Sequence, residues 1–222
     1  MMRRLKSGAL ALLVLAAVAA LPASASASEL VSGGTTVPVG TEVTGTDQSG
    51  AILFNNTSGE AFLACGGAKM TAVVTRNPGK TYGLNTTSFV FTGPGVEEKC
   101  KAGPYGDSRF AFLIGPKTPA CTFGSTSGSV SSLTIQGGSC EVPGSLRMTM
   151  ESPVVGTCYY RAESDRLDFL GNAGTEPLIF HTNGEQRLKG EAGNSGLCPG
   201  GFNLNIGALR MKTAAGADLM AK

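Results

Sequence analysis

The sequence contains no tryptophan, a single histidine (His181) and only 15% charged residues. Each scarcity removes a class of function. One histidine and no Cys-x-x-Cys pair exclude the usual zinc-binding and redox motifs. With no tryptophan and four tyrosines, aromatic platforms for sugars are scarce, which argues against a glycosidase. No phosphate-cradling glycine motif is present either. The sequence therefore predicts no cofactor and no metal ion.

Cations clustered on one surface are not evident from the sequence. The chain has 18 Lys and Arg against 16 Asp and Glu, and Arg3, Arg4 and Lys6 lie in the N-terminal segment. Residues 28–222 therefore hold 15 basic against 16 acidic residues, a net charge of −1. Their basic residues are scattered along the chain. Nucleic acids and anionic membrane surfaces both require clustered cations, so neither is expected as a partner.

The N-terminus has the layout of an export signal. A basic segment ends at Lys6, an apolar run of 14 residues extends from Gly8 to Leu21, and small residues follow Pro22. The apolar run is too short to span a hydrocarbon core of ~30 Å comfortably. We therefore predict that residues 1–27 are a cleaved signal peptide and that the released protein is secreted, with no membrane insertion after cleavage.

The cleavage site follows from the small residues that signal peptidase accepts. Cleavage between Ala27 and Ser28 is preferred, and cleavage after Ala25 fits the same rule. Lys6 stands where a twin-arginine signal has an apolar residue, so the general secretory route is expected.

Six cysteines follow the predicted signal, and an even number in an exported chain predicts three disulfides. Six cysteines allow 15 pairings, which the sequence alone does not resolve. The sequential pairing is favoured, and each bond would restrict the unfolded chain by roughly 3–4 kcal/mol. In this pattern the pairs are Cys65–Cys100, Cys121–Cys140 and Cys158–Cys198.

Apolar residues alternate with polar ones at several places, whereas no window shows a sustained helical stripe. Leu146, Met148 and Met150 alternate with polar residues, as on a strand with one buried face. The same pattern holds in 202–206, shifts by one at Gly207 and resumes in 209–212, which predicts a β-bulge.

Further strands are predicted between turn signals that contain glycine, proline or asparagine. The Asn183-Gly184 pair after the strand 178–182 predicts a hairpin. Short strands at spacings of about 10–15 residues favour an antiparallel β-sandwich of the Ig-like or jelly-roll-like type. We expect one such disulfide-stapled domain in residues 41–222, after a flexible lead-in in residues 28–40. The other predicted strands are 41–46, 51–54, 60–65, 70–75, 88–92, 110–114, 131–136 and 156–161.

Two segments resemble hydrolase motifs. The segment 193–196, Gly-Asn-Ser-Gly, resembles a serine-protease nucleophile segment, but His181 is only 14 residues upstream. The segment 105–108 contains the Gly-Asp-Ser start of one esterase family, yet the Asp-x-x-His that this family needs is missing. Both segments are interpreted as glycine turns, and no catalytic residue is assigned.

The acidic cluster of Glu163, Asp165 and Asp168 lacks the spacing of a calcium loop. A pair of glycosidase carboxylates would also need to face each other across a cleft. This cluster is interpreted as a solvated turn.

Three short motifs carry a family resemblance: Ala64-Cys65 before the strand 70–75, Gly-Thr-Cys-Tyr-Tyr-Arg at 156–161, and Leu-Cys-Pro at 197–199. With them the chain resembles exported, cysteine-containing, β-rich proteins of unassigned function from actinobacteria of the Solirubrobacter type. The resemblance implies a disulfide-bonded extracellular protein and supplies no catalytic residues.

The function expected from the sequence is therefore non-enzymatic: extracellular binding or adhesion, or a structural role at the envelope. The extracellular ligand or surface partner and the oligomeric state are not indicated. Two alternatives stay open. One is a secreted hydrolase with an unrecognised site, which would be tested by His181→Ala, and the other is a secreted protease inhibitor that presents the loop from Gly115 to Cys121.

Overall fold

The computed structural model describes residues 28–47, 49, 52–56, 61–93, 99–114, 120–138 and 143–222. The predicted signal peptide, most of the proposed inhibitory loop and Cys140 lie outside these residues. In the described part of the chain all regular structure is β, apart from one 3-10 turn, η1 (Gly103–Tyr105). The predicted all-β class is confirmed.

Eight antiparallel strands form a closed barrel, called here the first barrel. Each strand pairs with the next in chain order, and the last pairs with the first, so the barrel has no open edge. The strands are β3 (Glu42–Asp47), β6 (Gly67–Arg76), β7 (Tyr82–Thr92), β10 (Ala120–Ser127), β11 (Val130–Gly138), β15 (Arg166–Asn172), β16 (Ile179–Thr182) and β19 (Leu209–Thr213).

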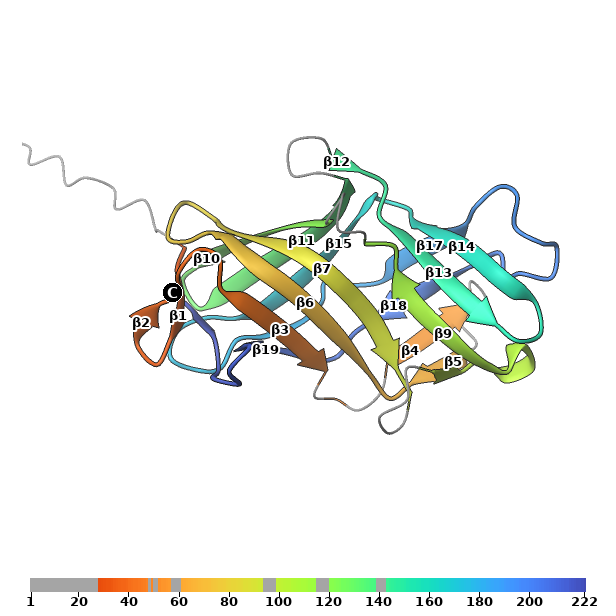
Figure 1. Ribbon diagram of the computed structural model, residues 1–222, viewed down its shortest axis with the longest axis horizontal. Helices are drawn as coiled ribbons and strands as arrows, with labels where there is room; N and C mark the ends of the chain where they lie inside the picture. The colour runs from red at the N-terminus through yellow and green to blue at the C-terminus, as the bar shows by residue number, and fades with distance from the viewer. Residues whose placement is uncertain are drawn as a thin grey trace, which may run out of the picture.

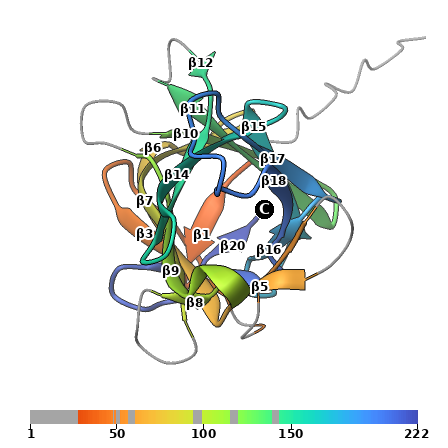
Figure 2. The same cartoon turned by 90° about the vertical axis from the view of Figure 1, so that its right-hand side faces the viewer.

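Eight further strands are joined by antiparallel pairings that also run in a circle, called here the second ring. It lies beside the first barrel along the long axis of the molecule (Figure 1), and the view along that axis shows the strands arranged around a ring (Figure 2). Its strands are β4 (Ile52–Asn56), β5 (Ala61–Cys65), β8 (Cys100–Lys101), β9 (Asp107–Phe112), β13 (Arg147–Ser152), β14 (Gly156–Ala162), β17 (Gln186–Gly190) and β18 (Gly201–Asn205).

Between β3 and β19, which are single strands of the first barrel, the chain alternates between the two assemblies and adds two strands to one and then two to the other, apart from the short β12 (Pro143–Gly144), which pairs with β11. A direct pairing of Val90 on β7 with Ala111 on β9 joins them. Neither assembly is therefore built from one contiguous segment. The predicted β-sandwich is not confirmed, because the strands close into a barrel instead of forming two open layers. Strands with one buried face have the same period-2 pattern in both architectures, so the pattern alone does not distinguish them.

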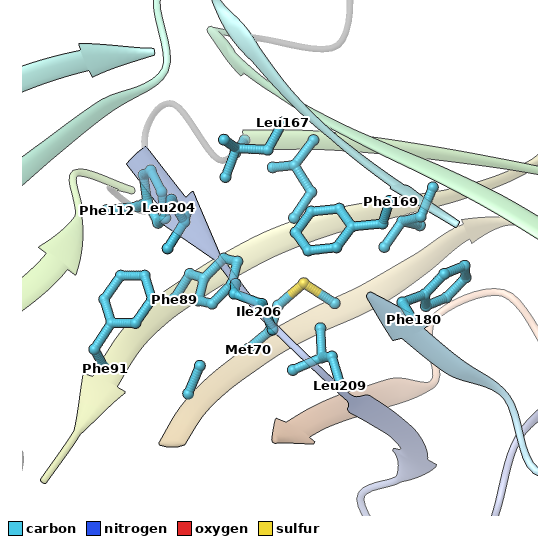
Figure 3. Close-up of a cluster of buried hydrophobic side chains, with 14 of the residues drawn as sticks. Met70, Phe89, Phe91, Phe112, Leu167, Phe169, Phe180, Leu204, Ile206 and Leu209 are labelled. Carbon is cyan, nitrogen blue, oxygen red and sulfur yellow. The ribbon is translucent and has the colours of Figure 1, made fainter. Parts of the chain in front are cut away.

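Aromatic side chains connect the two interiors (Figure 3). The rings of Phe89 and Phe91 on β7 lie 5.1 and 5.8 Å, centroid to centroid, from the ring of Phe112 on β9. All three side chains are buried. Burying a side chain of this size contributes about 1.5–3 kcal/mol, so the contact stabilises the junction as well as each interior.

A small sheet covers one end of the first barrel, at the left of Figure 1. It consists of β1 (Leu30–Ser32), β2 (Thr35–Thr36) and β20 (Met220–Ala221). Residues 28–40, expected to be a flexible lead-in, are thus part of the fold. Leu30 and Val37 are buried there, and the Thr126 amide donates to the Ser28 hydroxyl at 2.7 Å. The buried side chains of Leu30, Val31 and Val37 supply the cover that the barrel end requires.

Two local predictions need correction. Gly207 is not a bulge within one strand, because it lies between β18 of the second ring and β19 of the first barrel. The shift in alternation marks the crossing between them. Asn183-Gly184 does form a turn, with Gly184 at φ +70°, but the strands on either side do not pair with each other. β16 pairs with β15 and β19, while β17 pairs with β14 and β18.

Two buried tyrosines make stability sensitive to alkaline pH. Burial raises the pKa of Tyr82 and of Tyr160 well above that of an exposed phenol, which is about 10. The hydrogen bond between the Tyr82 and Ser131 hydroxyls lowers the pKa of Tyr82 by a smaller amount. Because the pKa of each phenol is higher in the folded than in the unfolded protein, the stability that the protonated tyrosines contribute is complete below about pH 10. This stability is lost as the pH rises further.

We therefore expect both phenols to stay protonated until the protein unfolds at high pH. A spectrophotometric tyrosine titration, recorded with circular dichroism, would show late ionisation that coincides with unfolding. The Tyr82→Phe variant should lose one late-titrating group. An unchanged titration amplitude in that variant would contradict the assignment.

Candidate functional site

A polar cleft of about 740 Å³ lies on the outer surface of the second ring. It lies over the neighbouring strands β13, β14 and β17, seen at the right of Figure 1, and over the segment that follows β17. A second hollow of about 410 Å³ shares Ser145 and Arg147 with it and extends to Gly137 on β11. The cleft and this second hollow together form one groove, called here the groove, which crosses the boundary between the second ring and the first barrel. The main charged and hydroxyl side chains of the cleft are Ser145, Arg147, Arg161, Glu163, Lys189 and Glu191.

Three cations form a row across the floor of the cleft. Arg147 on β13 is the register partner of Arg161 on β14, and Arg161 is the register partner of Lys189 on β17. All three side chains are exposed, whereas the residues on either side of Arg161, Tyr160 and Ala162, are buried. The strand alternation thus fixes the three cations on the same outer face.

Glu191 neutralises one end of the row. The Arg147 guanidinium donates two hydrogen bonds to the Glu191 carboxylate, from Nε at 2.6 Å and from Nη2 at 2.5 Å. These bonds raise the pKa of Arg147 above its usual value. The same guanidinium lies 5.6 Å from the centroid of the Tyr159 ring, in a cation–π contact. Arg147 is therefore held in place from two sides.

A second ion pair lies on the other side of the row. Arg187 Nε is 3.8 Å from Glu163 Oε2, and the Glu163 amide donates to the Arg187 carbonyl at 2.9 Å. Both side chains are more than half exposed, so this pair contributes little to stability. Glu163 lines the cleft together with Arg161 and Lys189, so this pair places a carboxylate beside these two cations.

The loop in residues 191–200 is fixed to β14 by covalent and hydrogen bonds. The Cys158–Cys198 disulfide ties it to the strand. The Asn194 side chain accepts from the Tyr159 amide at 2.9 Å and donates to the Tyr159 carbonyl at 2.8 Å. The Glu191 amide donates to the same carbonyl at 2.9 Å. These contacts position the Glu191 carboxylate against Arg147.

The predicted disulfides are confirmed where the structure describes both partners. Cys65 is bonded to Cys100, and Cys158 is bonded to Cys198. Cys121 is also disulfide-bonded, and its predicted partner Cys140 lies outside the described residues. No cysteine thiol is free in the described part of the chain.

The hydrolase-like segment 193–196 forms a turn, as predicted, whereas the segment 105–108 runs from the end of η1 at Tyr105 into β9. Gly193 has φ +98°, and the Ser195 hydroxyl accepts a hydrogen bond from the Leu197 amide. His181 lies on β16 of the first barrel, whereas Ser195 lies in the loop beside β14 of the second ring. Ser108 is buried and donates to the carbonyls of Tyr105 and Gly106.

In the acidic cluster, Glu163 and Asp165 lie at the turn between β14 and β15, as predicted, whereas Asp168 lies on β15, and each carboxylate has an arginine nearby. Asp165 adopts φ +57° and lies 3.9 Å from Arg161 Nε, while Asp168 lies 3.0 Å from Arg166 Nε. The described residues contain no group of three or more potential metal ligands.

Sequence reasoning missed the row of cations because its members are 14 and 28 residues apart. The basic residues appeared scattered, yet two strand registers place three of them side by side. The alternation in β13 was recognisable in the sequence, and it correctly placed Arg147 on the outer face. Nothing in the sequence specifies that β17 pairs with β14.

No protein-family model, curated protein or solved structure matches the chain. The resemblance to exported actinobacterial proteins therefore stays a prediction. No helix in the described residues is long and apolar enough to cross a membrane. The findings define the class of the molecule as an all-β, disulfide-bonded protein with a closed eight-stranded antiparallel barrel.

Proposed function

We propose that the protein is an exported, non-enzymatic binding protein and that the groove over β13, β14 and β17 is its binding site. The observation that carries this proposal is the polar cleft with three cations aligned by strand register. Strands hold these side chains on a rigid surface, and the disulfide-tethered loop holds Glu191 beside them. A preorganised polar site binds a ligand with little loss of conformational entropy.

Export is supported by the disulfides, because such bonds persist in oxidising compartments. A binding role is favoured over a hydrolase because the two serines singled out in the sequence are engaged with backbone groups, and His181 lies on a different assembly from Ser195.

The proposal predicts that ligands perturb the groove and are released unchanged. The disulfide-bonded protein would be titrated with a panel of acidic and neutral sugars, organic acids and peptides, while backbone amide resonances are recorded by NMR. Shifts should map to β13, β14, β17 and the loop in residues 191–200. Shifts confined to the distant end sheet of β1, β2 and β20 would contradict the site.

The enzymatic alternative is tested on the same samples by looking for product formation. Turnover of a panel member that disappears in the His181→Ala variant would overturn the non-enzymatic assignment and support the hydrolase.

A further inference from the structure

We propose that Arg161 and Lys189 together bind an oxyanion, and that the ligand of the cleft is a polyhydroxyl molecule that carries one, such as an acidic sugar or a sugar phosphate. This inference rests on the proposed binding function and specifies its ligand. Its basis is the pattern of charges along β14 and β17.

Among the described residues, carboxylates lie beside Arg147, Arg187 and Arg161 but not beside Lys189, so the central pair of Arg161 and Lys189 shares one solvent-screened carboxylate, that of Asp165. Arg147 is bonded to Glu191, and Arg187 lies close to Glu163. Between these two ion pairs, Arg161 and Lys189 lie directly opposite each other on neighbouring strands. Like charges in this position destabilise a sheet, and a bound anion would remove the repulsion.

The protein itself offers the central cations little compensation. Arg161 Nε lies 3.9 Å from Asp165 Oδ1, with 58% and 57% of the two side chains exposed, so solvent screens the pair. In the described part of the chain, Lys189 has no carboxylate within the 4 Å of an ion pair. Both cations line the cleft. Lys189 is therefore free to bind an external anion, and Arg161 can exchange its solvent-screened contact with Asp165 for the same anion.

The two side chains offer complementary donors to one oxyanion. A guanidinium donates two parallel hydrogen bonds to two oxygens of a carboxylate, phosphate or sulfate, and an ammonium group adds a mobile point charge. Such charge-assisted bonds are among the stronger ones in proteins. Two adjacent cations thus match one oxyanion better than they match an extended polyanion.

The carboxylates at the rim restrict the rest of the ligand. Glu163 and Glu191 lie on either side of the central pair and would repel a second anionic group close to the first. An ionised carboxylate has about four acceptor sites, so each can still accept hydrogen bonds from hydroxyl groups. This arrangement favours one oxyanion surrounded by hydroxyls, recognised by hydrogen bonds instead of by aromatic stacking.

The test compares matched probes by calorimetry at low ionic strength: glucose 6-phosphate, glucuronate, glucose and inorganic phosphate. We expect both charged sugars to bind at least about tenfold more tightly than glucose, since charge-assisted bonds are lost with the anion. Added salt should weaken the binding of the charged sugars. The preference between phosphate and carboxylate identifies which oxyanion the site takes.

Substitutions of the two central cations separate loss of binding from loss of folding. Lys189→Glu replaces the repulsion with an attractive pair opposite Arg161, so thermal stability should be maintained or raised while affinity falls at least about tenfold. Arg161→Gln should also lose affinity, whereas Arg161→Lys should retain part of it. Arg109→Gln, on the outer face of β9 beside Glu151 and away from the cleft, serves as the control and should bind like the parent.

The outcomes distinguish the two proposals. Undiminished binding of the charged sugars by Lys189→Glu would overturn the oxyanion site. Groove resonances that respond only to neutral or cationic compounds would overturn the oxyanion site and leave the binding function standing. A groove that responds to no panel member would remove both.

Discussion

Replacing Gly124 with alanine is expected to lower the free energy of unfolding by about 3 kcal/mol, because the added methyl group has no space. A Cβ at this position would lie 1.9 Å from two atoms of the Tyr82 ring. For a chain of this size the corresponding fall in melting temperature is about 6–12 °C. Thermal unfolding followed by circular dichroism measures it.

The Tyr82 ring cannot easily move away from an added methyl group. Gly124 on β10 is the register partner of Tyr82 on β7, so the ring covers the bare backbone of the glycine. The ring is fully buried, and its hydroxyl lies 2.9 Å from the Ser131 hydroxyl and 3.2 Å from the Ser132 carbonyl. Displacing the ring would break these bonds and disturb the interior of the first barrel.

A matched glycine provides the control. Gly196 lies in the loop beside β14, and nothing lies within 4 Å of a Cβ built there. Gly196→Ala should change the melting temperature little. In a double-mutant cycle, Gly124→Ala should cost much less in a Tyr82→Ala background. Additive losses in that cycle would show that the steric account is wrong.

The strand alternation predicted which side chains are buried, but not how the strands pair. Met148, Leu204 and Met211 all lie in the interior, as their alternation indicated. Which strands pair is decided by contacts between residues far apart in the sequence. The local turn and alternation patterns do not specify these contacts. The turn Asn183-Gly184 sends the chain from the first barrel to the second ring, although the same dipeptide typically closes a hairpin.

Some strands gave no clear signal at all. β10 consists largely of small and hydroxyl residues, including Gly124, because the Tyr82 ring from the neighbouring strand fills the space above it. β17 places only Gln186 and Leu188 inward among its five residues, too few for a convincing alternation. Because β17 was not predicted, the candidate site was not predicted either: Lys189 faces Arg161 only through the pairing of β17 with β14.

Removing either described disulfide should lower the free energy of unfolding by about 4 kcal/mol, since the bonds close loops with sequence separations of 35 and 40 residues. The expected fall in melting temperature is about 8–16 °C for each double alanine variant. Equilibrium unfolding of Cys65→Ala/Cys100→Ala and of Cys158→Ala/Cys198→Ala measures the two losses. A loss well below 1 kcal/mol would contradict the loop-closure account.

The two bonds should differ in their effect on the cleft, although their effects on stability are similar. Cys65–Cys100 joins β5 to β8, whose described pairing is limited to Ala64 and Lys101, so its removal weakens closure of the second ring. Cys158–Cys198 holds the loop that carries Glu191.

Without the Cys158–Cys198 bond, Glu191 no longer holds Arg147 firmly, and the ordering of the loop must be supplied by ligand binding. We therefore expect glucuronate or glucose 6-phosphate to bind more weakly to Cys158→Ala/Cys198→Ala than to Cys65→Ala/Cys100→Ala at a temperature where both remain folded. Equal affinities in the two variants would show that strand register alone organises the site, without a contribution from the tethered loop.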